Sequence, residues 1–335
     1  MRLRTRNGVR GAFVTPTITY AAAMHIHARA LKYFDMIRRC GSIREAARRL
    51  HVASSAINRQ LLQLEEAIGS PLFDRMPGGL RLTAAGEIFS RHVITVLQDE
   101  HRMASELDAL KGIRRGELSI AAIEGVNADL LPNVLERMMK RYPMLHISVR
   151  PAGSEVAAAA VAAGDADVAI GYSIERNEAL RQCALGRFRL GAIMPADHPL
   201  ASRTSVSFAD CARYPLILAG KPLSIHTQLR PLLSHHRKPI TVLMESASVE
   251  LAKSMCLRGV GLAFQTRIGI EDELREGRLV HVPLIAAGPV ISDLGIYVRS
   301  GRSLPPALDA LIRVLSEEVA RCEADEPTLN PQGPA

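Results

Sequence analysis

The feature of this 335-residue chain that most constrains its fold is a pair of amphipathic helical patterns separated by only four residues. The first pattern opens with Ser42 and Glu45, a Ser-x-x-Glu capping-box signature, and ends at Leu50. The second follows the break at 51–54 and has apolar residues at spacings of four, three and four: Ile57, Leu61, Leu64 and Ile68. A short helix, a tight turn and a longer helix predict a helix-turn-helix.

Flanking patterns extend this unit on both sides. A helix is predicted from Ala28 to Cys40, with Gly41 as the residue that ends it. On the other side, Leu72-Phe73 and 80–82 are short apolar pieces on either side of a Pro-Gly-Gly turn. They predict two small strands that form a β wing.

A long helical pattern begins after Thr83, which can cap it, and runs to about Lys111. Its apolar residues form one narrow stripe: Phe89, Val93, Val96, Met103, Leu107 and Leu110. A stripe of this length opposite a polar face predicts packing against the same helix of a second chain. The alternative is a surface helix that lies on its own domain.

Charge is distributed unevenly along the chain. Residues 1–116 have 19 basic and 10 acidic side chains, whereas residues 117–335 have 23 basic and 24 acidic ones. The net charge of +8 therefore originates in the first third. This asymmetry favours one module that meets a polyanion, joined to a near-neutral body with another task.

After Gly116, strand-like apolar runs alternate with helical patterns. The expected strands are 118–123, 146–149, 168–172, 190–194, 216–218, 240–244, 262–264, 280–282 and 294–298, and the expected helices are 127–141, 155–163, 249–257 and 306–321. The alternation predicts βαβ units on parallel-rich sheets, and about 200 residues fit two small α/β lobes better than one sheet. The tail from Glu323 has no apolar periodicity and is predicted to be disordered.

Several function classes lack their signatures in this chain. No GxSxG, HExxH or GxxxxGK[ST] motif occurs, and Gly259 and Gly261 precede a predicted strand, which indicates a turn. An enzyme in the body is therefore a weakly supported alternative. The five cysteines contain no CxxC pair and His235-His236 has no partner at ligand spacing, so no metal, cofactor or disulfide framework is expected. No apolar run is long enough to span a membrane, and scattered thiols favour a cytoplasmic location.

The polar face of the second motif helix suggests how it would meet DNA. Its candidate contacts are Ser54, Ser55, Asn58 and Arg59. A helix in the major groove reads bases with its first turns, so Asn58 is expected to pair with adenine and Arg59 with guanine or a phosphate. Ser54 and Ser55 would bind phosphates at the helix N-terminus. Flanking basic residues are expected to give salt-dependent backbone affinity: Arg29, Lys32, Arg44, Arg48, Arg75 and Arg81.

Residues 31–86 resemble the N-terminal winged helix-turn-helix of LysR-type transcriptional regulators. The resemblance rests on these fragments at the spacing of that family: Leu31-x-Tyr33-Phe34, Gly41-Ser42, Ala46-Ala47-x-x-Leu50-His51-Val52, Ala56-Ile57-Asn58-Arg59-Gln60, Leu64-Glu65-x-x-Ile68-Gly69, Leu72-Phe73-x-Arg75 and Leu82-Thr83-x-x-Gly86. A weaker likeness continues through Leu131-Pro132, Tyr142-Pro143, 164–170 and His198-Pro199-Leu200, so that it covers about residues 27–321.

The resemblance implies an N-terminal all-α winged helix-turn-helix (24–82), a long linker helix for dimerisation (83–113) and a C-terminal α/β effector-binding body (117–322). That body would resemble periplasmic binding proteins, with lobe I formed by 117–187 and 284–322 and lobe II by 188–283. Residues 1–23 would be an extension ahead of an alternative start at Met24, and 323–335 a disordered tail. The implied function is a cytoplasmic bacterial regulator. It would form dimers or tetramers, bind operator DNA and RNA polymerase, and respond to a small effector.

Ligands of open α/β sheets bind beyond the C-terminal ends of strands, at the N-termini of helices. Applied to this body, the rule nominates the following effector contacts: Glu124, Gly125, Val126, Asn127, Gly153, Ser154, Tyr172, Ser173, Gly220, Leu223, Ser224, Gln265 and Thr266. Unpaired N–H groups there favour an anionic group such as a carboxylate. The carboxylate of Glu124 indicates that the ligand also carries a hydrogen-bond donor.

Two positions depart from the commonest pattern of the family. Ala53 stands where a serine often caps the recognition helix, so Ser54 is expected to take over the cap. Gln265-Thr266 stands where the family often has Leu-Pro, so the pocket residues of other family members do not map directly onto this chain. An alternative from another class is an effector-independent architectural DNA-binding protein, which no metabolite would stabilise in a thermal shift.

Overall fold

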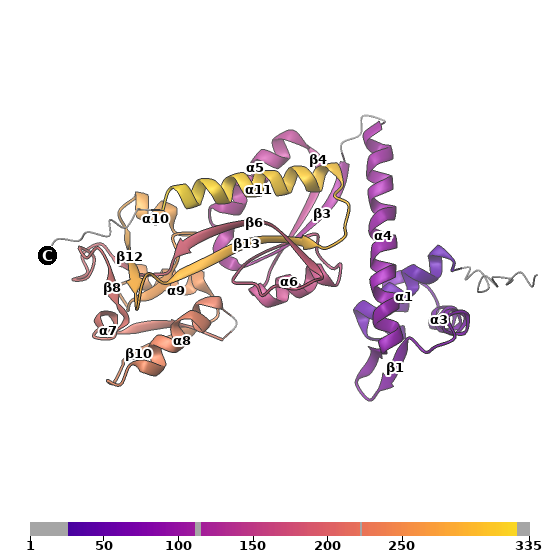
Figure 1. Cartoon of the computed structure of the whole chain (residues 1–335), viewed down its shortest axis with the longest axis horizontal. Coiled ribbons are helices and arrows are strands. Elements are labelled where there is room, and N and C mark those ends of the chain that lie inside the picture. The colour runs from indigo at the N-terminus through magenta and orange to yellow at the C-terminus, as the bar shows by residue number, and fades with distance from the viewer. Residues whose placement is uncertain (1–25, 111–114, 222, 327–335) are drawn as a thin grey trace, which may run out of the picture. The chain divides into compact units, whose positions relative to one another are not determined.

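The computed structural model describes residues 26–110, 115–221 and 223–326 (Figure 1). The chain forms two compact units, with the boundary after Leu97. The expectations for residues 1–23 and for the end of the tail at 327–335 lie outside the described residues. None of the described helices is long and apolar enough to cross a membrane.

The N-terminal unit is a helix-turn-helix with a two-stranded wing. Its elements are α1 (Ala28–Cys40), α2 (Ile43–Leu50), α3 (Ser54–Ile68), β1 (Phe73–Met76), β2 (Gly79–Leu82) and the first half of α4 (Ala84–Leu110), which continues past the boundary. Phe34 is at the centre of the core, with ring centroids 5.1 Å from Phe73 and 4.9 Å from Phe89. Ile57, Leu61 and Leu64 of α3 pack into the same core. The predicted helix-turn-helix and wing are therefore confirmed.

The helix ends differ in part from the sequence expectation. Ser42 caps α2 by accepting a 3.4 Å hydrogen bond from the N–H of Glu45, but the Glu45 carboxylate pairs with Arg48 and Arg49 and does not complete the capping box. The expectation that Ser54 caps α3 is wrong. Ala53 is the N-cap residue, and no side chain closes this end of α3.

The apolar stripe of α4 is divided between two environments. Phe89 and Val93 are buried in the core of the N-terminal unit, with Val96 packed against it. Met103 and Leu107 are 56% and 49% exposed. The expectation that the whole stripe faces a partner is therefore wrong for its first half. This half packs on its own domain, where Phe89 covers the buried ring of Phe34.

Lobe I of the C-terminal unit is built on a five-stranded sheet in the order β4-β3-β5-β13-β6. The strands are β3 (Arg115–Ala122), β4 (Met144–Pro151), β5 (Val168–Tyr172), β6 (Leu180–Arg189) and β13 (Ile291–Arg299), and the helices are η1 (Glu124–Asn127), α5 (Leu130–Arg141), α6 (Ser154–Ala162) and α11 (Pro306–Ala324). Helices α5 and α11 lie on one face of the sheet and α6 lies on the other (Figure 1).

Lobe II contains a four-stranded sheet in the order β11-β7-β12-β8 and a separate parallel pair of β9 and β10. Its strands are β7 (Gly191–Pro195), β8 (Val206–Ser207), β9 (Leu216–Ala219), β10 (Val242–Ser246), β11 (Ala263–Gln265) and β12 (Leu279–Ile285). Its helices are α7 (Phe208–Cys211), α8 (Ser224–His235), α9 (Val249–Leu257) and α10 (Glu271–Arg275). The chain crosses between the lobes twice, from β6 to β7 and from β12 to β13.

The sheets are mixed where the alternation predicted mainly parallel pairing. In lobe I, β3 is parallel to β4 and β5, but β13 is antiparallel to both β5 and β6 because the chain returns from lobe II in the opposite direction. Strand β6 and helix α8 were not predicted from the sequence. Strand β6 is half-exposed with polar residues, and α8 contains Pro231 in its interior.

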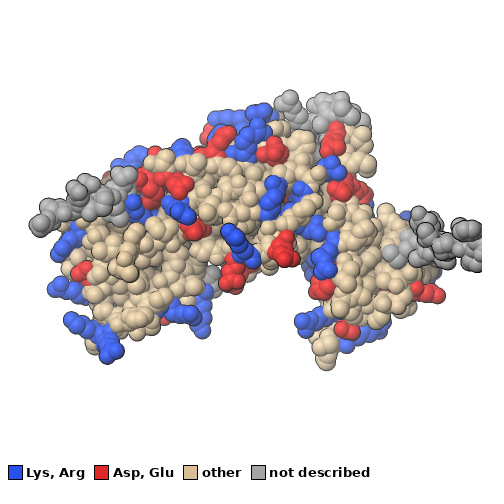
Figure 2. Space-filling view, viewed as in Figure 1, with Lys and Arg blue, Asp and Glu red and all other residues tan. Residues whose placement is uncertain are grey.

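The predicted disorder from Glu323 is wrong for the described part of the tail. Helix α11 continues to Ala324, and the Glu323 carboxylate accepts a 3.0 Å hydrogen bond from the N–H of Arg187. Arg321 pairs with Asp325 at 2.9 Å. Polar contacts therefore order this end of the helix. Such contacts leave no signal in the apolar pattern of the sequence. Acidic and basic side chains lie next to each other along this side of the unit (Figure 2).

Gly86 provides a test of the packing between the wing and α4. A Cβ at this position would lie 2.1 Å from the carbonyl oxygen of Leu72, whereas a Cβ at Gly78 would meet nothing within 4 Å. Glycine to alanine in a helix normally stabilises by up to about 1 kcal/mol. We expect Gly86→Ala to destabilise the N-terminal unit by about 2 kcal/mol through the backbone clash.

Hydrogen exchange of peptides from residues 26–97 in the full-length protein measures this local stability. Faster exchange throughout these peptides is expected for Gly86→Ala, and unchanged exchange for Gly78→Ala. Slower exchange in the Gly86→Ala protein would contradict the packing described here.

Candidate functional site

The outer face of α3 presents the residues proposed to read DNA. Ser54, Ser55 and Arg59 are exposed and Asn58 is half-buried, and Ser55 and Arg59 lie on the side of the helix opposite the buried Ile57, Leu61 and Leu64. Because no side chain caps this helix, its first N–H groups are available to an anion. This arrangement is compatible with a helix whose first turns enter a groove of DNA.

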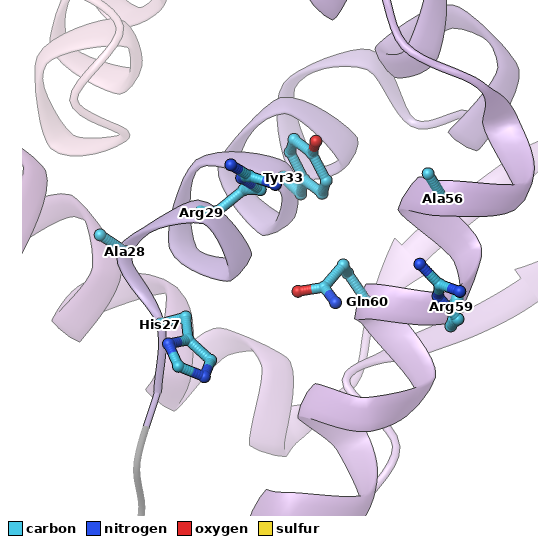
Figure 3. A pocket seen from close by; sticks show the side chains of 7 residues that line it. All are labelled: His27, Ala28, Arg29, Tyr33, Ala56, Arg59 and Gln60. Carbon is cyan, nitrogen blue, oxygen red and sulfur yellow. The ribbon is translucent and has the colours of Figure 1, made fainter.

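A hollow of about 470 Å³ lies between the start of α1 and the first half of α3 (Figure 3). Arg29 and Tyr33 of α1 line one wall, and Arg59 and Gln60 of α3 line the other. The fold thus brings together two arginines that are 30 positions apart in sequence. Two guanidinium groups at one hollow next to an uncapped helix end give this surface a strong preference for phosphate oxygens.

The other basic candidates are spread around this surface. Lys32, Arg44, Arg75 and Arg81 are exposed, and the last two lie on the wing strands. Arg48 is also exposed, but its guanidinium pairs with Glu45 at 2.8 Å. Contacts of these side chains with phosphates stay a prediction.

The second candidate site is a cavity of about 420 Å³ in the C-terminal unit. Elements of both lobes line it, and they include the starts of three helices: α6 of lobe I and α8 and α9 of lobe II. Ten of the residues nominated from the sequence are found there: Glu124, Gly125, Asn127, Gly153, Ser154, Tyr172, Leu223, Ser224, Gln265 and Thr266.

Three nominated residues do not line the cavity. Val126 is fully buried in the core of lobe I, because the short helix η1 turns its side chain inward. Ser173 has a φ of 51° and donates its N–H to the carbonyl of Asp293, which directs the chain away from the cavity. Gly220 donates its N–H to the carbonyl of Ser246 and lies between β9 and β10. The cavity lining therefore does not include them, and their nomination as effector contacts stays a prediction.

Lining residues at the start of α9 and on β13 were not among the residues predicted from the sequence. Ser248 and Val249 directly follow β10, and Ser292 belongs to β13. The strand-end rule would have found Ser248, because 240–244 had been predicted as a strand and 249–257 as a helix. Ser292 has no such signal, since it is the second residue of β13 and lies far from the C-terminal end of that strand.

Glu124 has a different role from the one expected. Its carboxylate accepts 2.8 Å hydrogen bonds from the hydroxyl of Ser248 and from the N–H of Val249, one to each oxygen. A lobe I side chain therefore caps a lobe II helix, in the position where a negative charge is favoured. Each oxygen can accept a further hydrogen bond, so the expectation that Glu124 meets a donor on the ligand stays a prediction.

Three further hydrogen bonds join the lobes around the cavity. The hydroxyls of Tyr172 and Thr266 lie 2.7 Å apart, and Ser292 donates to the side-chain oxygen of Gln228 at 2.8 Å. Burial raises the pKa of Tyr172, so that its hydroxyl keeps its proton. The third joins the N–H of Gly269 to the carboxylate of Asp129 and belongs to a larger network.

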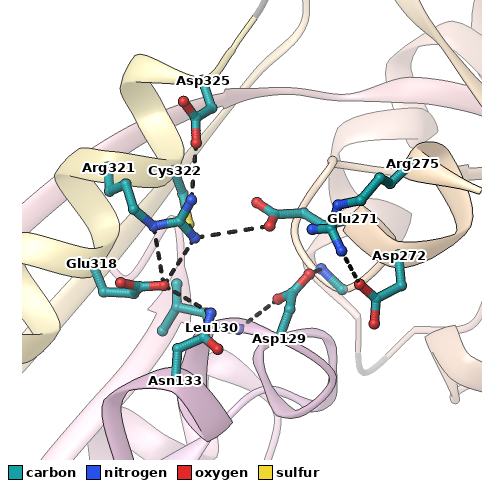
Figure 4. A network of polar contacts seen from close by, with 11 residues as sticks. Asp129, Leu130, Asn133, Glu271, Asp272, Arg275, Glu318, Arg321, Cys322 and Asp325 are labelled. Carbon is teal, nitrogen blue, oxygen red and sulfur yellow. Dashed lines mark hydrogen bonds and ion pairs between the residues drawn. The ribbon is translucent and has the colours of Figure 1, made fainter. Parts of the chain in front are cut away.

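A carboxylate and arginine network lies at the same seam (Figure 4). Asp129, at the start of α5, accepts hydrogen bonds from Leu130 N at 2.6 Å and from Gly269 N of lobe II at 2.9 Å. Arg321 of α11 lies 3.8 Å from Glu271 of lobe II. Burial raises the pKa of Asp129 and of Glu271, and the nearby Asp129 carboxylate raises that of Glu271 further.

Three of the five cysteines are buried thiols of low reactivity. All five are free, and burial raises the pKa of Cys211, Cys256 and Cys322 to about 12. The thiolate, which is the reactive form, is therefore rare at these positions. Within the described residues, no group of three His, Cys, Asp or Glu side chains is placed to hold a metal ion.

Two family models match the chain. One, described as a bacterial regulatory helix-turn-helix protein of the lysR family, matches residues 28–87, and the other, described as a LysR substrate binding domain, matches residues 111–320. A RuBisCO operon transcriptional regulator from Allochromatium vinosum is 27% identical over 298 residues, which are 89% of this chain and 98% of the relative. The transcriptional activator protein LysR from Escherichia coli is 25% identical, with coverage of 76% and 82%.

Solved structures share the fold. A full-length OxyR variant from Pseudomonas aeruginosa matches with a TM-score of 0.68 at 21% identity, covering 92% of this chain and 99% of that one. A full-length CbnR in complex with its target DNA matches with a TM-score of 0.50 at 20% identity, covering 88% and 100%. At these identities the likeness concerns the architecture.

The pKa shifts predict that two aspartate variants respond to pH in opposite directions. Because the pKa of Asp129 is raised in the folded state, its contribution to stability is present below its ordinary pKa and is lost as pH rises through the raised value. Hydrogen bonds from Ser207 lower the pKa of Asp210, so its contribution is present above the ordinary value and is lost as pH falls. Asparagine does not titrate at either position.

We therefore expect the destabilisation by Asp129→Asn to shrink as pH rises above about 4, and that by Asp210→Asn to shrink as pH falls below about 4. Urea unfolding of the full-length proteins, followed by circular dichroism between about pH 3 and pH 7, measures both. Parallel pH trends for the two variants would contradict this assignment.

Proposed function

The chain belongs to the LysR family of bacterial helix-turn-helix regulators, and from this premise we propose that a small molecule in the 420 Å³ cavity controls how α3 binds operator DNA. The observation that carries the proposal is the seam between the lobes. The cavity is bounded by hydrogen bonds whose two partners come from different lobes. A ligand that binds one lobe arrangement more tightly than another shifts the population toward it.

The connections between the lobes allow such a change. Only the segments from β6 to β7 and from β12 to β13 join the lobes covalently in the described chain. Two neighbouring crossings form a natural hinge, since a few backbone dihedrals at Leu190 and at 286–290 can absorb a rotation. The cross-lobe hydrogen bonds then decide which arrangement is populated.

Self-association is part of the proposal. Met103 and Leu107 lie on the second half of α4 and are about half-exposed, where a paired helix would cover them. We propose a dimer through this half of α4, extended to a tetramer, so that several copies of α3 meet successive half-sites on one DNA face. The protein would act in the cytoplasm, together with RNA polymerase.

Two other functions are less well supported. An architectural DNA-binding protein without an effector has no use for a cavity lined by the starts of three helices. An enzyme in the same cavity would need a nucleophile or an acid and base pair, but Glu124 is the only acidic residue in the described lining, no Cys or His lies there, and Tyr172 holds its proton. The relatives named above are regulators of transcription.

Arg59 tests the role of α3 in DNA binding. We expect Arg59→Ala to weaken binding to the operator by at least about 1 kcal/mol, because a guanidinium makes bidentate contacts that alanine cannot replace. Genome-wide mapping of bound DNA provides the operator, and fluorescence anisotropy at fixed salt then gives the affinity. Arg213→Ala is the matched control, since it removes the same charge from an exposed position of lobe II.

Arg29 separates phosphate contacts from base contacts. Arg29→Ala should weaken operator and unrelated DNA alike and reduce the salt slope by about one, whereas Arg59→Ala should affect the operator more. Equal affinities of wild type and Arg59→Ala, measured at the same salt, would remove Arg59 from the DNA interface.

A further inference from the structure

Two contacts of lobe I reach different elements of lobe II. Glu124 caps the start of α9, and Asp129 accepts a 2.9 Å hydrogen bond from the N–H of Gly269. We propose that Lys253 is a positioning residue that couples these two contacts, so that they form and break together. Its consequence for the effector response rests on the proposed function, whereas the coupling itself is a property of the C-terminal unit.

The ammonium group of Lys253 is buried and surrounded by three partners. The side chain is 6% exposed and belongs to the second turn of α9. Its Nζ donates to the carbonyl oxygen of Gly269 at 3.2 Å and pairs with Glu250 at 2.9 Å and with Glu273 at 3.0 Å. An ammonium has three N–H groups, which matches this number of acceptors. Lys253 therefore links α9 to α10 and to the turn at 267–270.

The turn at 267–270 is also the part of lobe II that meets Asp129. Gly269 donates its N–H to Asp129 and accepts from Lys253 through its carbonyl oxygen, so one residue lies between lobe I and α9. It has a φ of +86°, and a Cβ there would lie 2.3 Å from the carbonyl oxygen of Gly125. The two backbones are thus in direct contact. A displacement of Gly269 therefore changes its distances to Asp129 and to Lys253 at the same time.

The same turn is joined to the wall of the cavity. The Nε2 of Gln265 donates to the carbonyl oxygen of Ile268 at 3.1 Å, and the Nε2 of His281 lies 3.0 Å from the carbonyl oxygen of Gln265. Gln265, Thr266 and Ile268 line the cavity. The hydroxyl of Thr266 lies 2.7 Å from that of Tyr172 in lobe I. A ligand that separates these two hydroxyls therefore displaces the turn.

This link from the cavity to the turn uses residues that depart from the commonest pattern of the family. Leucine at position 265 would have no amide to donate to the carbonyl oxygen of Ile268. Proline at position 266 would have no hydroxyl for Tyr172. The hydrogen bonds that connect the cavity wall to the turn are therefore a property of this chain.

Lys253 closes the path between the two contacts. Glu124 holds the first N–H group of α9, Lys253 holds the turn to the next part of α9, and Asp129 holds the turn to lobe I. Groups that share one network of hydrogen bonds and ion pairs show interaction energies beyond their separate contributions. A ligand that displaces the turn therefore also draws α9 away from Glu124, and the lobes separate in one step.

Hydrogen exchange of the full-length protein, without DNA or added ligand, tests the coupling. Glu124→Ala removes both acceptors from the start of α9. In the wild-type background we expect it to speed exchange by about threefold or more in peptides that cover 249–253 and also in peptides that cover 267–270. In the Lys253→Met background it should still speed exchange at 249–253, but change exchange at 267–270 by less than about twofold.

Two further variants separate positioning from a general loss of stability. Lys253→Met/Glu273→Gln removes both charges of the buried pair, so the Glu273 carboxylate is not left buried without this cation. Arg302→Met is the matched control, because Arg302 is 7% exposed and forms an ion pair with Asp167 of lobe I at 2.6 Å. We expect the double variant to lose the coupling, as Lys253→Met does, and Arg302→Met to keep it.

The coupling does not pass through Lys253 if Glu124→Ala speeds exchange at 267–270 equally in the wild type, in Lys253→Met and in the double variant. The proposal is also wrong if Glu124→Ala leaves 267–270 unchanged in the wild type, or if Arg302→Met abolishes the coupling. All of these exchange rates are measured without DNA. Operator binding of the same variants is measured separately by anisotropy, so a failure of the coupling is distinguished from a failure of the proposed function.

Discussion

The cap that Glu124 places on α9 is the interaction on which the C-terminal unit depends. A carboxylate from lobe I accepts hydrogen bonds from the first N–H group of a lobe II helix and from the hydroxyl of Ser248. If the lobes were apart, the carboxylate and both donors would lose these partners. Beside it, the two backbones touch: a Cβ at Gly269 would lie 2.3 Å from the carbonyl oxygen of Gly125. Because glycine is required for this approach and has a φ of +86° there, the seam is fixed by backbone geometry as well as by charge.

The same cap determines the chemistry of the cavity. Glu124 is the only ionisable carboxylate in the described lining, and its two oxygens accept hydrogen bonds from the hydroxyl of Ser248 and the N–H of Val249. The cavity also presents helix N-termini and buried hydroxyls. These neutral groups select a ligand by the direction of the hydrogen bonds that it can form. The unit therefore separates two tasks: ionised side chains such as Arg321 and Glu271 hold the lobes together outside the cavity, and neutral groups face the ligand.

Elements with strong periodicity could be predicted from the sequence, and pairings across the lobes could not. The spacing of Ile57, Leu61 and Leu64 predicts both α3 and the exposure of Arg59, because burying one face of a helix leaves the opposite face in solvent. The strand-end rule likewise found Ser154 and Thr266 in the cavity. It also found Glu124 in the cavity but not its partner, since a strand end shows where a side chain starts but not that Ser248, 124 positions later, meets it. A hydrogen bond between distant segments leaves no local pattern.

The energies at the seam are of the size that regulation needs. In the described chain, the hydrogen bonds that cross between the lobes include these five: two that Glu124 accepts, one that Asp129 accepts, one between the hydroxyls of Tyr172 and Thr266, and one that Ser292 donates. At about 1 kcal/mol each, they favour the observed arrangement by on the order of 5 kcal/mol. Turning a two-state population from 1:99 to 99:1 takes about 5.5 kcal/mol of differential binding. If the hydrogen bonds between the lobes were much stronger, no small ligand could change the lobe arrangement. If they were much weaker, the arrangement would change without a ligand. A ligand that competes for Tyr172 and Thr266 can therefore shift this equilibrium.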